Sequence, residues 1–146
     1  TIAPGTVLDA TGHLTIGGDL TFAPFARLAI DVAGSKPDLF DQLTVGGDLA
    51  LDGAVLDFTL VKGVQIAAGR FLELIDLIGT RTGLFDGLSE GGLVASDHGT
   101  AYRITYVGGD GNDVGIYTAP VPLPATLGLM AAALGGLGAL TRRRRS

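Results

Sequence analysis

The chain has 146 residues, of which 47% are hydrophobic and 24 are glycine, and its formal net charge at pH 7 is −5. It contains no cysteine, which excludes a disulfide framework and a thiolate metal site. Without the four arginines at positions 142–145, the chain carries 6 basic against 15 acidic residues, a net charge of −9. Such a surface repels polyanions, so nucleic-acid binding is excluded.

Residues 1–118 are predicted to be all-β. Short runs that alternate polar and apolar residues are separated by Gly-Gly-Asp, Gly-Ser and Asp-Gly turns, the pattern of strands that bury one face. No long helical periodicity precedes the C-terminal segment. Three buried faces are expected, formed by Leu28, Ile30 and Val32, by Leu56, Phe58 and Leu60, and by Tyr102, Ile104 and Tyr106.

A seven-residue motif occurs twice in this region. Leu-Thr-Ile-Gly-Gly-Asp-Leu at 14–20 returns as Leu-Thr-Val-Gly-Gly-Asp-Leu at 43–49, 29 residues later. Recurrence at this period indicates stacked units that bury their apolar faces against one another. The repeat therefore predicts coils of a parallel β-helix or solenoid, with a chance similarity between two hairpins as the alternative.

Acidic residues form two candidate catalytic pairs, and neither pair is expected to be catalytic. Glu73 and Asp76 are three positions apart in a predicted strand, so strict alternation points them to opposite faces. Asp31 and Asp57 are expected on solvent-facing sides of their strands, where they discourage aggregation. No paired carboxylates for glycoside hydrolysis are therefore predicted.

The two histidines do not indicate nucleophilic catalysis either. His13 and His98 lack a Gly-x-Ser-x-Gly elbow, and the Ser96-Asp97-His98 run resembles a loop rather than a triad. Both are interpreted as turn or surface residues. The sequence therefore predicts no catalytic residue and no enzymatic activity in this chain.

One glycine-rich segment has a composition that suits calcium binding. Gly108–Asp113 matches the first six positions of the calcium-binding nonapeptide, with Asp110, Asn112 and Asp113 as candidate ligands. The eighth position is Gly115 instead of a large apolar residue, and the segment occurs once. A hairpin turn between two strands is the preferred interpretation, and no cofactor is expected.

The C-terminal segment has three parts. A linker and motif at 119–125 precede the uncharged run 126–141, and a basic tail at 142–146 ends the chain. An uncharged helix of 16 residues measures roughly 24 Å, slightly short of a hydrocarbon core of about 30 Å. We expect a single transmembrane helix with a cytoplasmic basic tail, which places the preceding residues beyond the membrane. A simple membrane anchor is the alternative.

This tail resembles the PEP-CTERM sorting signal in its VPLPA variant, in which Leu123 replaces the glutamate of the commoner form. The resemblance implies recognition by an exosortase and a transient anchor in the inner membrane of a Gram-negative bacterium. It also implies release to the cell surface or the extracellular polysaccharide matrix of a biofilm. The implied sorting motif is Val121, Pro122, Leu123, Pro124 and Ala125, and the implied topology signal is Arg142, Arg143, Arg144 and Arg145.

The end of the body resembles the last coils of β-helix passengers in bacterial autotransporters and haemagglutinin-like adhesins. The resemblance rests on the segments 69–72, 82–85, 102–106 and 109–113. It implies solenoid-like coils capped by antiparallel strands, with a non-catalytic role as adhesin or matrix protein. Because the chain begins at Thr1 without an initiating methionine, we expect a piece of a longer precursor. The alternative is the end of a β-helix polysaccharide lyase or hydrolase whose active site lies upstream.

Overall fold

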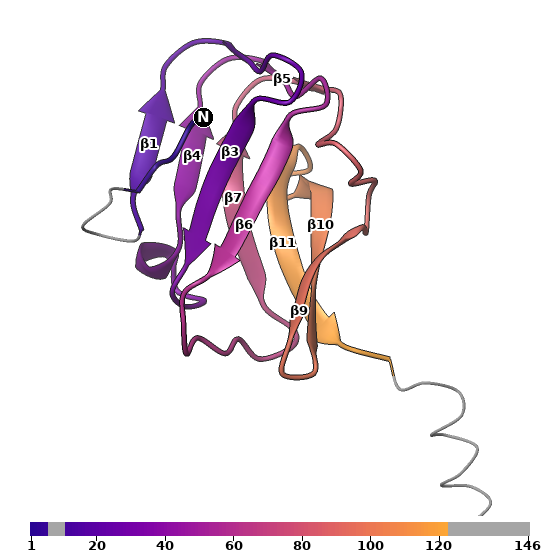
Figure 1. Ribbon diagram of the computed structural model, residues 1–146. Helices are drawn as coiled ribbons and strands as arrows, with labels where there is room; N and C mark the ends of the chain where they lie inside the picture. Colours follow the sequence, from indigo (N-terminus) through magenta and orange to yellow (C-terminus); the bar gives the residue numbers. More distant parts are fainter. Residues whose placement is uncertain (6–10, 123–146) are drawn as a thin grey trace, which may run out of the picture.

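The computed structural model describes residues 1–5 and 11–122, and almost all of its regular elements are strands (Figure 1). These residues contain one short 3-10 helix, η1 (Pro37–Leu39), and no α-helix, which confirms the all-β prediction for this part of the chain. The strands are β1 (His13–Ile16), β2 (Leu20–Thr21), β3 (Arg27–Val32), β4 (Gln42–Val45), β5 (Leu49–Ala50), β6 (Val55–Leu60), β7 (Phe71–Leu77), β8 (Arg81–Thr82), β9 (Leu93–Asp97), β10 (Thr100–Gly108) and β11 (Asp113–Pro120).

The strands form three sheets. The largest has the order β1-β4-β7-β11-β10-β9, and it is mixed, because β1, β4 and β7 are parallel while β11, β10 and β9 pair antiparallel. The sheets β2-β5-β8 and β3-β6 are parallel throughout. The described chain thus contains parallel and mixed sheets, but they do not close into a solenoid.

The 29-residue repeat is also the pairing register of the first strands. Leu14 lies beside Leu43 in the β1–β4 pair, and Leu20 lies beside Leu49 in the β2–β5 pair. The two copies of the motif therefore stack side by side in parallel, and the chance-hairpin alternative is wrong. A third round, β7 and β8, continues the stack without carrying the motif.

The turns between these strands stack as well. Asp19 Oδ1 accepts a hydrogen bond from Asp48 N at 2.7 Å, and Asp48 Oδ1 accepts one from Thr80 N at 2.8 Å. Each aspartate therefore binds a backbone N–H in the next round of the stack. We call these Gly-Gly-Asp turns the corners.

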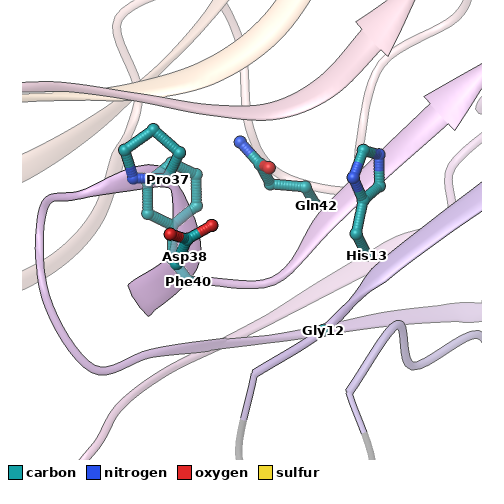
Figure 2. A pocket seen from close by; sticks show the side chains of 6 residues that line it. All are labelled: Gly12, His13, Pro37, Asp38, Phe40 and Gln42. Carbon is teal, nitrogen blue, oxygen red and sulfur yellow. The ribbon is translucent and has the colours of Figure 1, made fainter.

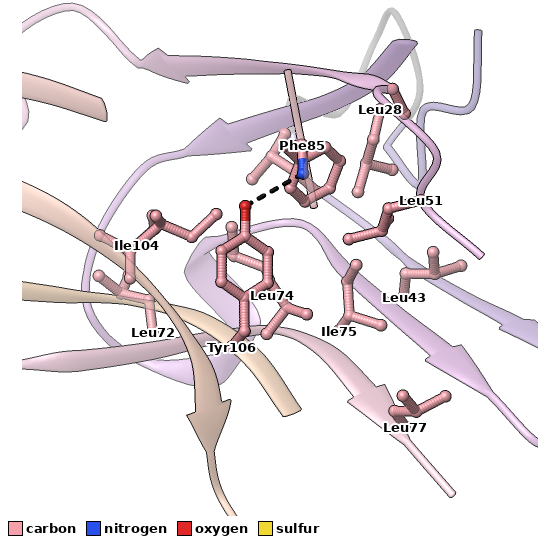
Figure 3. Close-up of a cluster of buried hydrophobic side chains, with 14 of the residues drawn as sticks. Leu28, Leu43, Leu51, Leu72, Leu74, Ile75, Leu77, Phe85, Ile104 and Tyr106 are labelled. Carbon is pink, nitrogen blue, oxygen red and sulfur yellow. Dashed lines mark hydrogen bonds between the residues drawn. The ribbon is translucent and has the colours of Figure 1, made fainter. Parts of the chain in front are cut away.

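The core lies between the sheets and is built from alternate residues of the strands. Two of the three predicted faces, that of β3 and that of β10, are fully buried, whereas the β6 face is only partly buried. Tyr106 combines packing with hydrogen bonding (Figure 3). Its hydroxyl accepts from Phe85 N at 3.1 Å and donates to Leu88 O at 2.6 Å, which ties the loop after β8 to the large sheet.

The Gly108–Asp113 segment is the predicted hairpin turn. It joins β10 to β11, which pair antiparallel from Thr100–Pro120 to Gly108–Asp113. Gly109 and Gly111 have φ of 54° and 114°, a backbone conformation that favours glycine.

No helix in residues 1–5 and 11–122 is long and apolar enough to cross a membrane. The predicted transmembrane helix at 126–141 and the basic tail at 142–146 lie outside the described residues, as do Leu123, Pro124 and Ala125 of the sorting motif.

Candidate functional site

Three carboxylates meet on the outer face of the large sheet. Oxygen atoms of Glu73, Asp76 and Asp113 all lie within 4.8 Å of one another. We call these three residues the carboxylate cluster. The prediction that Glu73 and Asp76 point to opposite faces is therefore wrong.

A β-bulge in β7 is the cause. Val114 of β11 pairs with Ile75, but the next residue, Gly115, pairs with Glu73, so Leu74 is an extra residue on β7. Leu74 and Ile75 are both fully buried, which interrupts the alternation and returns Asp76 to the side of Glu73. A bulge re-aims side chains in this way. The apolar doublet Leu74-Ile75 within an alternating strand is the sequence signal that could have revealed it.

The hairpin turn supplies the third carboxylate and is fastened to the end of β7. Asp113 is 3% exposed, and its Oδ1 accepts a hydrogen bond from Leu77 N at 2.8 Å. Asn112 Nδ2 donates to Leu77 O at 2.9 Å and to Gly79 O at 2.7 Å. Of the three calcium candidates, Asn112 and Asp113 thus hold the turn in place, while Asp110 contributes its backbone N–H to Asp113 Oδ2 at 3.4 Å.

The electrostatics of the cluster favour retention of protons. Burial raises the pKa of Glu73, and the nearby charges of Asp113, Asp76 and Asp110 raise it further. Burial also raises the pKa of Asp113, although hydrogen bonds from the backbone of Leu77 and Asp110 oppose this rise. Both shifts disfavour the fully ionised cluster.

A polar groove leads away from the cluster across β4 to β1. One hollow is lined by Gly12, His13, Pro37, Asp38, Phe40 and Gln42 (Figure 2). A second hollow shares His13 and Gln42 and continues to Thr44, Glu73 and Asp76. His13 Nε2 lies 2.7 Å from Thr44 Oγ1, and Gln42 Nε2 donates to Glu73 O at 3.4 Å. The groove therefore crosses three successive parallel strands.

The chemistry open to the cluster is limited. Carboxylate oxygens this close suit a hard cation such as calcium or the sharing of a proton. Their separation is near the roughly 5 Å of a retaining glycosidase pair. However, Glu73 and Asp76 project from one face of one strand, so they would lie on the same side of a substrate and would not flank its scissile bond.

The histidines do not belong to this or to any common site. His13 lies in β1 and His98 follows β9, and these strands are the two opposite edges of the large sheet. His98 is exposed, has φ of 48°, and its Nδ1 lies 2.8 Å from Asp97 Oδ1. Among residues 1–5 and 11–122, no hydrogen bond joins a serine to either histidine, so the interpretation as surface and turn residues is confirmed for His98. His13 is a surface residue within a strand.

The remaining carboxylate pair lies diagonally across two neighbouring strands. Asp57 lies beside Ala29 in the β3–β6 register, whereas Asp31 lies beside Thr59. Asp57 Oδ2 is 3.9 Å from Arg27 Nη1, and both side chains are more than half exposed. These residues are solvent-facing charges, as predicted.

The start of the predicted sorting motif lies directly after the last strand. β11 ends at Pro120, and Val121 N donates to Gly99 O at 2.9 Å. Comparison of the chain with protein-family models, with curated proteins and with solved structures found no match.

Proposed function

We propose that this chain is a non-catalytic region of a surface or extracellular-matrix protein, exported and sorted through its C-terminal segment. The observation that carries the proposal is the order of three parts in the sequence: the VPLPA motif, an uncharged run and four arginines. An exosortase would recognise the motif while the run anchors the precursor in the inner membrane. Processing would then release the body to the cell surface or to the polysaccharide matrix of a Gram-negative bacterium.

The position of the motif supports this proposal. β11 ends at Pro120, and of the two motif residues that the structure describes, Val121 is held to the body by a backbone hydrogen bond to Gly99. Pro120, Val121 and Pro122 are exposed at the end of the described chain. A protease that reads an extended segment needs this kind of access, since buried or sheet-paired backbone resists cleavage.

The body supports a structural role. Successive rounds pair in parallel at offsets of 29 and 32 residues, and the antiparallel strands β11, β10 and β9 follow the third round. We propose that this region forms the last coils of a β-solenoid with an antiparallel cap, and that it serves as an adhesin or biofilm matrix component. Such stacks offer long surfaces to polysaccharide partners without requiring a catalytic centre.

The test is the C-terminal mass of the protein recovered from its native host, measured separately in membrane and extracellular fractions. Loss of residues 126–146 from the extracellular form is the expected result. The double variant Pro122→Ala/Pro124→Ala should remain full length and membrane-bound, while Pro24→Ala, which lies outside the motif, should be processed normally. Recovery of only the full-length chain, all in the inner membrane, would reduce the segment to an ordinary anchor and overturn the proposal.

A further inference from the structure

We infer that the end of the body from which the C-terminal segment leaves is a docking surface for an anionic lipid bilayer. The surface consists of the loop 61–70, the turn 97–100 and the last residues of the described chain, 118–122, and we call it the exit face. This inference rests on the proposed function, because it requires the uncharged run at 126–141 to enter a membrane.

Hydrogen bonds join the three segments of the exit face. Thr118 Oγ1 donates to Ala67 O at 2.7 Å, which links the last strand to the loop. Thr100 Oγ1 donates to Ile66 O at 3.1 Å, which links the turn to the same loop. The turn also accepts the hydrogen bond of Val121 N. The three segments therefore lie together at one end of the strands (Figure 1).

The charge balance of the exit face is opposite to that of the whole chain. The exit face contains Lys62, Arg70 and His98 and a single carboxylate, Asp97, whereas the chain has 15 acidic and 10 basic residues. All three basic side chains are exposed, and Lys62 and His98 line one hollow. Asp97 Oδ1 lies 2.8 Å from His98 Nδ1, and among the described residues neither Lys62 nor Arg70 forms an ion pair.

The opposite end of the strands is acidic. β1 and β4 end at the corners that carry Asp19 and Asp48, and Asp76 and Asp113 of the carboxylate cluster lie where β7 ends and β11 begins. The negative field of an anionic bilayer attracts the exit face and repels these carboxylates. The charges of the body therefore favour one orientation, with the exit face toward the bilayer.

Apolar groups accompany the cations of the exit face. Ala67 and Ala68 are exposed in the loop, and residues 120–122 are exposed at the end of the described chain, with Val121 at 42%. Basic and apolar groups on one surface suit the interface of a bilayer, where the cations meet phosphate groups and the apolar groups enter the headgroup region.

The C-terminal segment would hold the exit face close to the bilayer. β11 ends at Pro120, and residues 121–125 separate it from the uncharged run. Five extended residues reach at most about 18 Å, which is roughly two Debye lengths at physiological salt. Because so short a tether makes the contact intramolecular, a few cations suffice for docking that would be weak between separate molecules.

The experiment uses the full chain in vesicles without any other protein, made either of phosphatidylcholine alone or of phosphatidylcholine mixed equally with phosphatidylglycerol. The chain has no cysteine, so Ala68→Cys carries one fluorophore on the exit face and Ala23→Cys carries one at the opposite end. Ala23 precedes β3, and β3 runs parallel to β6, which ends at the loop 61–70. Lipids with a quencher in the headgroup should quench the Ala68 probe in the mixed vesicles and leave the Ala23 probe unquenched.

The ratio of quenched to unquenched probe gives the docking equilibrium constant. Lys62→Gln/Arg70→Gln should lower this constant roughly thirtyfold in the mixed vesicles, the effect of losing two cations near an anionic surface. Arg27→Gln is the matched control, because Arg27 is an exposed cation at the start of β3, and it should leave docking unchanged. Asp97→Asn should strengthen docking, because it removes the carboxylate of the exit face.

Equal quenching of the Ala68 and Ala23 probes, or no quenching of either, would overturn the inference. Equal docking in the two kinds of vesicle, or an unchanged docking constant for the double variant, would also overturn it. Flotation of the vesicles separates these results from failure of the proposed function. A chain that floats with both kinds of vesicle is anchored whatever the probes report, whereas a chain that floats with neither has no membrane anchor, which would overturn the proposed function as well.

Discussion

Replacing Glu73 by glutamine is expected to stabilise the folded protein at pH 7. Carboxylate oxygens of the cluster lie within 4.8 Å, a distance at which two unit charges repel by about 0.9 kcal/mol in water and about 3.5 kcal/mol at an effective dielectric constant of 20. Glu73 is half-buried and Asp76 is exposed, so the lower part of this range applies. We expect a gain of about 1 kcal/mol, or roughly 4 °C in Tm for a domain of this size.

The raised pKa values also predict how the stability changes with pH. Because the pKa values of Glu73 and Asp113 are raised in the folded state, the folded protein binds more protons than the unfolded chain above the ordinary carboxyl pKa of about 4. The stability that these groups contribute is therefore fully present at pH values below the unfolded-state pKa. It is lost as the pH rises through the raised folded-state pKa values. Glu73→Gln removes part of this loss, so the variant and the native chain should converge near pH 3.

The assay is thermal unfolding by circular dichroism from pH 3 to pH 8, with EDTA present to remove divalent cations. Asp57→Asn is the matched control, because its carboxylate is solvent-exposed beside Arg27 and its loss should change stability little at any pH. An equal or lower Tm of Glu73→Gln at pH 7 would show that the cluster is not a source of repulsion. That result would refute the reasoning from the bulge geometry.

Two further pairs of variants and one single variant probe the core and one strained turn. Tyr106→Phe should lower the free energy of unfolding by about 1–3 kcal/mol, because two backbone groups lose their hydrogen-bond partner. Tyr102→Phe should be neutral or stabilising, since the Tyr102 hydroxyl is buried without a partner. Unfolding in denaturant compares the two variants. Leu43→Ala should lower the free energy of unfolding by about 2–5 kcal/mol. Leu14→Ala, at the equivalent but exposed position, should lower it by less than about 1 kcal/mol. Similar losses in the two variants would contradict the difference in burial. Phe25→Gly should raise the Tm, because Phe25 is 72% exposed with φ of 63°, a strained conformation that costs about 1–3 kcal/mol.

The architecture was predictable where the pattern was local or repeated. Alternation predicted the buried faces of β3 and β10, because a strand with one buried face alternates apolar and polar residues. The repeated motif predicted parallel stacking of its two copies, while their pairing register is a finding of the structure. The third round was not predictable from the repeat, because β7 and β8 keep the stacking positions while only Gly79 of the glycine pair remains.

The carboxylate cluster was missed for a physical reason. Period-two alternation assumes one residue against one across the ladder, and the extra residue Leu74 breaks this rule. Asp113 comes to the cluster from 40 positions beyond Glu73 through the β7–β11 pairing, which no local pattern records. Only the apolar doublet Leu74-Ile75 hinted at the bulge, and a doublet occurs equally well in strands buried on both faces.

The two ends of the large sheet differ in how their strands pair. At one end β1 is the parallel edge strand of the described sheet, whereas beyond β7 the antiparallel β11 occupies the position that a further parallel round would need. The antiparallel strands therefore end the succession of parallel rounds on the β7 side of this sheet. The C-terminal segment leaves from β11, three strands from β1 and hence roughly 14 Å across the sheet, and the described chain ends far from β1 (Figure 1). The parallel strands and the antiparallel strands therefore occupy opposite halves of the large sheet, and the described chain leaves from the antiparallel half.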